Sequence, residues 1–208
     1  MGFGLIFIGY LFTVFDTAFI VNDSLLLFAA RIMCLFGYAV LLFGLRKYAR
    51  YSVWAKYSMI GCSLMCAFMA AEAVLQGLWH FGACGDALMY GIRRVTFPMI
   101  AAVFAAAQIT LMYAIFDTGR ETECDKVKKA GIRSVAATAA FCLINFAAAL
   151  PFSLGAAFDA VRYGLFVALT IMNAVTVYTA YRYICLDTEL EAERAEALKE
   201  RTFKKDKK

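Results

Sequence analysis

The sequence predicts an all-α polytopic integral membrane protein, a six-helix transmembrane bundle with a short cytoplasmic C-terminal helix. Two observations predict this class. Of the 208 residues, 63% are hydrophobic and 18% are charged, far from the composition of a soluble domain. Seventeen of the 21 Lys and Arg residues fall into three clusters separated by long apolar stretches, at positions 46–56, 120–133 and 182–208. Each pair of clusters brackets two spans, so the positive-inside rule places all three clusters on the cytoplasmic side.

Six apolar segments are long enough for the roughly 20 residues that cross a hydrocarbon layer. Residues 1–21 lack a basic leader and a small-residue cleavage site, so we expect them to stay attached as the first span. The first two spans form a tight hairpin around a short turn at 22–24. We therefore expect a transmembrane domain over 1–186, with spans at 2–21, 25–45, 58–78, 95–116, 134–152 and 163–183.

The connections differ in character. The 46–57 segment mixes basic and aromatic residues, which is typical of a loop at the headgroups. The glycine-containing 79–94 segment is expected to be the largest outer loop, and the polar 117–133 segment a cytoplasmic connection. Pro98 is expected to begin or kink the fourth helix, and Pro151 to end the fifth.

The last segment, 187–208, is expected to be a charged juxtamembrane helix followed by a basic tail. It opens with Thr188 and Glu191 in the spacing of a capping box. Its apolar positions do not sustain three heptads, so a coiled coil is not supported. A solvated helix and a protein-docking helix remain the two interpretations.

Three ionisable residues fall inside the predicted spans: Asp16, Arg31 and Glu72. Such residues are costly in lipid unless they are paired or face water. All three are expected at one depth in the outer half, and Asp16 is the first choice as partner of Arg31, while Glu72 either shares the same guanidinium or remains as an excess acid. The charges either order the bundle as an ion pair or form the polar floor of an outward-facing cavity.

Further arginines lie toward the outer rim: Arg93, Arg94 and Arg162, accompanied by Asp86 and Asp159. If they converge, they favour an anionic or zwitterionic solute. Alternatively, each guanidinium reaches to headgroups and anchors its helix. The candidate substrate-binding residues are therefore Asp16, Arg31, Glu72, Arg93, Arg94 and Arg162.

Deeper amides, such as Gln76, Gln108, Asn145 and Asn173, are explained by hydrogen bonds between helices at least as well as by substrate contact.

The net charge of +5 is explained by lipid rather than by nucleic acid, because the basic residues lie beside apolar spans. We expect the bilayer itself to be the main partner. The residues expected to anchor the chain at anionic headgroups are Arg46, Lys47, Arg50, Lys56, Lys128, Lys129, Lys204 and Lys205.

No catalytic, phosphate-binding or dinucleotide-binding motif is present, which disfavours an enzyme, and no cofactor is expected. His80, Cys84 and Asp86 could hold a metal in the 79–94 segment, but their spacing matches no closed ligand set, so no metal is expected. Cys62 and Cys66 share one helix face and are explained by packing.

Six spans with both ends cytoplasmic give a layout similar to that of the substrate-binding subunits of energy-coupling vitamin transporters. The likeness is one of size and topology. Those subunits typically present an alanine-spaced docking face on the first helix, whereas residues 2–16 here are bulky.

We expect a bacterial-type inner-membrane protein with both termini in the cytoplasm that binds or transports a small polar or anionic solute through an outward-facing cavity. The alternative is a structural or signalling subunit that docks a partner through segments 117–133 and 187–203. The sequence leaves the oligomeric state and a second membrane subunit open.

Overall fold

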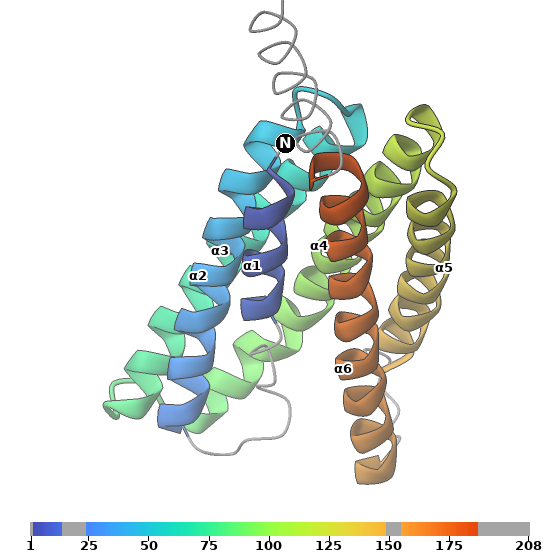
Figure 1. Cartoon of the computed structure of the whole chain (residues 1–208). Helices are drawn as coiled ribbons and strands as arrows, with labels where there is room; N and C mark the ends of the chain where they lie inside the picture. Colours follow the sequence, from blue (N-terminus) through green and yellow to red (C-terminus); the bar gives the residue numbers. More distant parts are fainter. Residues whose placement is uncertain (1, 14–23, 149–154, 187–208) are drawn as a thin grey trace, which may run out of the picture.

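The computed structural model describes residues 2–13, 24–148 and 155–186, and these residues are helical apart from short connections (Figure 1). No strand occurs within these ranges. The elements in chain order are α1 (Phe3–Thr13), α2 (Ser24–Tyr48), α3 (Val53–His80), α4 (Asp86–Glu121), α5 (Asp125–Ala148), α6 (Gly155–Ala180) and a π-helical segment η1 (Tyr181–Leu186).

The predicted all-α membrane bundle is confirmed. Helices α2, α3, α4 and α6 are each long and apolar enough to cross a membrane, and α1 is a shorter apolar helix within the described residues. The predicted spans 2–21 and 134–152 extend into residues 14–23 and 149–154, which lie outside the described residues. The predicted domain boundary after residue 186 stays a prediction for the same reason.

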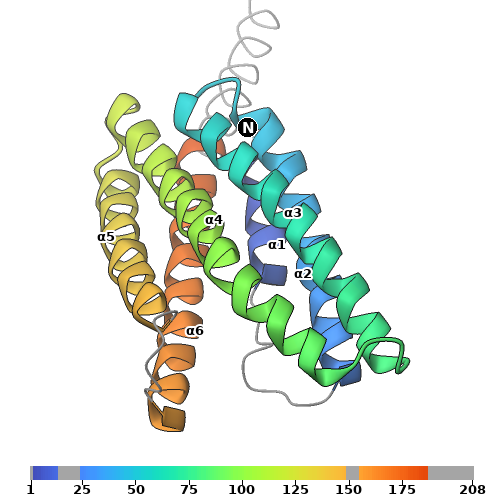
Figure 2. The same cartoon turned by 180° about the vertical axis from the view of Figure 1, so that it is seen from behind.

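The six helices form a closed ring in chain order. Each helix packs against the next, and α6 returns to contact α1 (Figures 1 and 2). The 49–52 and 122–124 connections lie at one end together with the start of α1 and η1, whereas the 81–85 connection lies at the other. We call the first the basic end, since it carries Arg46, Lys47, Lys128 and Lys129, and the second the distal end. The described chain therefore begins and ends at the same end of the bundle.

The connections are much shorter than the sequence predicted. The 79–94 segment was expected to be a large loop, but α3 continues to His80 and α4 begins at Asp86. Trp79 Nε1 donates a hydrogen bond of 2.7 Å to Asp86 Oδ1 and closes the turn. Gly82 lies in this turn with a positive φ of 74°, which glycine adopts without strain. The 46–57 and 117–133 segments are likewise mostly helical, because polar residues continue a helix beyond its apolar span once water can solvate them.

Glycines bring α1 and α2 close together. Gly9 faces Gly37, and a Cβ atom added to Gly9 would lie 2.5 Å from the backbone nitrogen of Leu41. Gly2 faces Gly44 in the same way, and this second pair lies nearer the basic end. The two pairs follow the small-residue packing by which membrane helices approach closely. Short α1 is therefore held against α2 by backbone contact.

Buried polar side chains join the helices in the middle and basic half of the bundle. Tyr48 Oη of α2 donates to the carbonyl oxygen of Ala114 on α4 at 2.7 Å. Asn173 Nδ2 of α6 donates to Tyr10 Oη of α1 at 3.0 Å and to Thr138 Oγ1 of α5 at 3.1 Å. Asn173 thus does what the sequence predicted for a deep amide.

Pro98 lies inside α4 and does not begin it. Because proline has no amide hydrogen, it leaves out the helical bond to the carbonyl of Arg94. The distal part of α4, which carries Arg93 and Thr96, is the part that precedes Pro98. The expected role of Pro151 falls outside the described residues.

Candidate functional site

Arg31 of α2 and Glu72 of α3 meet in the interior. Arg31 Nε lies 3.9 Å from Glu72 Oε2, and the two side chains are 9% and 6% exposed. Arg31 Nη1 also lies 3.6 Å from Met69 Sδ. The expectation that charges at one depth meet across neighbouring helices is confirmed for this pair. Asp16, the first choice as partner of Arg31, lies outside the described residues.

Helix α4 adds two side chains to this pair. Thr96 Oγ1 donates to Glu72 Oε1 at 3.3 Å. Arg93 is half-buried and close enough to interact electrostatically with Glu72, which attracts it, and with Arg31, which repels it. One carboxylate is therefore shared between two guanidinium groups and a hydroxyl.

Gln76 follows Glu72 by one turn of α3, on the same face and toward the distal end. Its side chain is fully buried, and neither its amide nitrogen nor its amide oxygen has a hydrogen-bond partner among the residues that the structure describes. A buried amide in this condition costs about 1–3 kcal/mol. We call Arg31, Glu72, Gln76, Arg93 and Thr96 the polar cluster.

The polar cluster lies in the distal half of the bundle. Arg31 and Arg93 are each about two turns after the starts of α2 and α4, and Glu72 is about two turns before the end of α3. The sequence could mark these charges, because ionisable residues stand out in apolar spans. It could not single out Gln76 from the other amides, because the lack of a partner depends on side-chain positions.

A small cavity of about 140 Å³ adjoins Glu72 between α3 and α4. At about 30 Å³ for each water molecule, it has room for a few waters or for part of a small solute. The carboxylate and the Thr96 hydroxyl are the polar groups in its wall, which is formed by Phe68, Ala71, Glu72, Leu75, Ile92 and Thr96.

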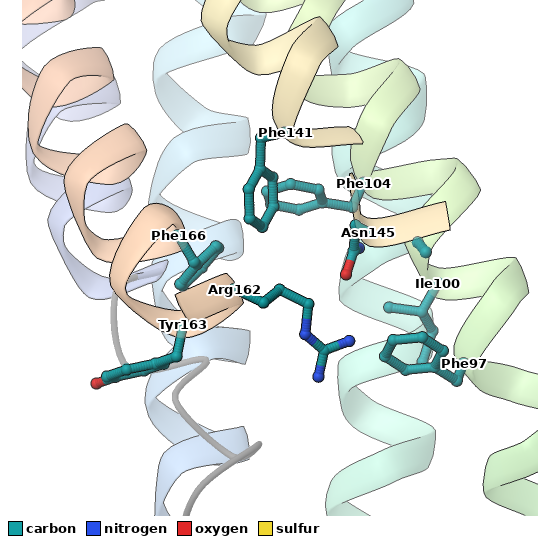
Figure 3. A pocket seen from close by; sticks show the side chains of 9 residues that line it. Phe97, Ile100, Phe104, Phe141, Asn145, Arg162, Tyr163 and Phe166 are labelled. Atoms are coloured by element: carbon teal, nitrogen blue, oxygen red, sulfur yellow. The ribbon is translucent and has the colours of Figure 1, made fainter. Parts of the chain in front are cut away.

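Arg162 of α6 lies in a second, aromatic pocket of about 40 Å³ between α4, α5 and α6. Its guanidinium carbon lies 5.7 Å from the ring centre of Phe97. Figure 3 shows the side chain reaching from α6 toward Phe97, with the Asn145 amide pointing into the same space. Phe97 is one turn from Arg93 on α4, so Arg162 contacts α4 one turn away from Arg93. The other walls are Ile100, Ala101, Phe104, Phe141, Tyr163 and Phe166.

Two further rim residues, Arg94 and Asp86, form no hydrogen bond or ion pair with the polar cluster within the described part of the chain. Arg94 is exposed, whereas its neighbour Arg93 is half-buried. Asp86 accepts the hydrogen bond of Trp79. The side chain of Asp159 lies outside those that the structure describes. The convergence of these charges on one opening, which the sequence analysis gave as a condition for solute binding, therefore stays a prediction.

The described residues offer no group of three His, Cys, Asp or Glu side chains placed to hold a metal ion. The ring of His80 packs against Phe81 at 5.2 Å between centres. Cys62 is buried, and both it and Cys66 are free thiols. These positions agree with the packing roles that the sequence analysis preferred.

The fold and the cluster together define an all-α membrane protein with paired charges in one half of its bundle and, beside them, an amide that no described residue hydrogen-bonds. No protein-family model matches the chain, and comparison with curated proteins and with solved structures finds no similar protein.

Proposed function

We propose that this protein binds a small polar solute with a negatively charged group at the polar cluster, and that it serves as a binding or transport protein for that solute. The arginines supply the positive charge, and Glu72 keeps them from repelling each other. Thr96 and Gln76 supply neutral hydrogen-bonding groups. The cavity beside Glu72 and Thr96 gives the solute a place next to the carboxylate and the hydroxyl.

Gln76 is the observation that carries the proposal. An ion pair by itself is explained by ordering of the bundle, because buried opposite charges need each other whatever the function. A fully buried amide without a partner in the described part of the chain has no such explanation, because leucine of similar size would be more stable there. A solute that accepts from the amide nitrogen and donates to the amide oxygen removes this penalty.

The charge distribution supports an orientation. Basic residues at membrane-helix ends favour the cytoplasm, so the basic end would face inward in the plasma membrane, with both chain ends cytoplasmic. The distal end would face outward, and the polar cluster would lie in the outer half. Solute would then enter from outside the cell.

The test compares two leucine substitutions in the full chain purified in detergent. Thermal unfolding is followed with single additions of acetate, succinate, glutamate, glycine and phosphate, since a solute that binds the folded state raises its unfolding temperature. Gln76→Leu should abolish any such shift. Gln108→Leu is the matched control, because Gln108 is also a buried amide but lies about four turns further along α4 from Arg93.

Two outcomes would contradict the proposal. Either Gln76→Leu responds to the same solutes as the wild-type protein, or none of the five solutes stabilises the wild-type protein. If the first holds and Gln76→Leu is also less stable without solute, Gln76 is a packing residue.

The alternative of a docking subunit has less support from the described residues. One of its two docking segments, 117–133, is helical except for the connection at 122–124. Its other segment, 187–203, lies outside the described residues. Removal of residues 187–208 with unchanged solute response would separate the two functions.

A further inference from the structure

A groove of about 550 Å³ lies on the outside of the α1 and α2 pair at the basic end. It is separate from the polar cluster, which lies in the distal half. Its walls are formed by three apolar and three basic residues, Leu5, Val40, Phe43, Arg46, Lys47 and Arg50.

The basic side chains lie together at one end of this groove. Arg46 and Lys47 are in the last turn of α2, and Arg50 is in the connection that follows. All three are exposed, and none of the residues that line the groove is acidic. This end of the groove therefore presents three positive charges to an anion.

The apolar side chains continue from the charges toward the middle of the bundle. Val40, Phe43 and Lys47 follow one face of α2 at the spacing of a helix, and Arg50 follows in the connection after it. Phe43 is 65% exposed and Phe36, one turn before Val40, is 52% exposed. Charge at the helix end and apolar surface below it is the order of headgroup and acyl chain in a phospholipid.

We propose that this groove binds one anionic phospholipid, with its phosphate on Arg46, Lys47 and Arg50 and an acyl chain along Val40 and Phe43. The site differs from general attraction of basic residues to a negative membrane because its apolar wall contributes to the same ligand. A soluble anion without an apolar chain gains no binding energy from that wall. A zwitterionic phospholipid leaves the three charges without a net counter-charge.

The test measures binding of phosphatidylglycerol and phosphatidylcholine to the full chain in detergent by native mass spectrometry. Removing a basic residue near a membrane surface lowers affinity for an anionic lipid by roughly fivefold. The triple variant Arg46→Ala, Lys47→Ala, Arg50→Ala should therefore bind phosphatidylglycerol on the order of 100-fold more weakly. Its weaker binding of phosphatidylcholine should not change.

The matched control is the triple variant Lys128→Ala, Lys129→Ala, Arg133→Ala on α5. It removes the same charge from exposed side chains at the same end of the bundle, away from the groove. This variant should keep the wild-type affinity for phosphatidylglycerol. Equal losses in both triple variants would show general surface attraction and would overturn the site.

A separate part of the experiment tests the apolar wall of the groove. Phe43→Ser, at an exposed position that does not support the core, should weaken phosphatidylglycerol binding while retaining the unfolding temperature. Glycerol phosphate, which has the charge without the chains, should compete poorly. If Phe43→Ser binds as tightly as wild type, or glycerol phosphate displaces the lipid completely, the groove holds a phosphate group and no lipid.

Discussion

Two charged side chains, Arg31 and Glu72, lie in the distal half, where burial of a charge in an apolar interior costs free energy. Arg31 and Glu72 each lower the cost of the other, and Thr96 donates to the carboxylate. Removing one member leaves its partner buried with an uncompensated charge. Removing both leaves an apolar contact between α2 and α3.

Glu72→Gln should therefore lower the free energy of unfolding by about 3 kcal/mol, whereas the double variant Arg31→Met, Glu72→Met should recover most of that loss. Unfolding of the detergent-solubilised protein by titration with sodium dodecyl sulfate measures both. An additive double variant would mean that the two side chains do not depend on each other.

Arg93 and Arg94 provide a comparison of neighbouring residues of the same type. Arg93→Gln should weaken solute binding by about tenfold, the value of a hydrogen bond to a charged group, whereas Arg94→Gln should leave it unchanged. The solute is whichever of the five additions stabilises the wild-type protein, and the midpoint of its thermal-shift titration is the measurement. Equal effects would indicate long-range attraction by net charge.

The sequence could predict the meeting of Arg31 and Glu72, because opposite charges at one depth in adjacent spans have strong reason to pair. It could not predict that Arg162 lies against Phe97 in an aromatic pocket, because an arginine near a helix end reaches headgroups or rings equally well. The contrast between Arg93 and Arg94 was also hidden, since it depends on the rotation of α4.

At the scale of the helix, small residues decide which helices touch most closely. Gly9 on α1 and Gly2, directly before α1, are seven residues apart, as are Gly37 and Gly44 on α2, so the two antiparallel segments meet at both positions. A seven-residue spacing keeps a residue on nearly the same face of a helix. Side chains at these positions would push the helices apart.

Gly9→Val should lower the free energy of unfolding by about 3 kcal/mol, because its side chain would collide with the backbone of α2. Gly164→Ala is the control, since an added Cβ atom there meets nothing within 4 Å. It should stabilise the protein by about 0.5–1 kcal/mol through better helix propensity. The same detergent titration reports both, and a tolerated Gly9→Val would show that α1 is not held by these contacts.

The order of the helices was predictable from the alternation of apolar stretches and basic clusters. Their ends were not. Gly82, Gly85 and Gly91 looked like helix breakers, but Gly85 lies at the cap of α4 and Gly91 continues within it. Hydropathy marks where a helix leaves the lipid, not where its hydrogen bonding stops.

Over the whole molecule, the ring is closed by α6 on α1, and both ends of the described chain lie at the basic end. An even number of membrane passages follows if each helix crosses once. The prediction rests on the three clusters of basic residues rather than on any single contact.

A green fluorescent protein fused at either the N-terminus or the C-terminus should therefore fluoresce in a bacterial host, because it folds only on the cytoplasmic side. Alkaline phosphatase inserted at 81–85 should be active, because that connection would lie outside. Fusions at the two ends that report opposite sides would contradict both the orientation and the even number of passages.

Pro98 divides α4 into two parts joined by a turn with one fewer backbone bond. The distal part carries Arg93 and Thr96, whose partner Glu72 belongs to α3. A change in the attraction between these groups acts on the shorter part of α4, which is joined to the longer part at Pro98.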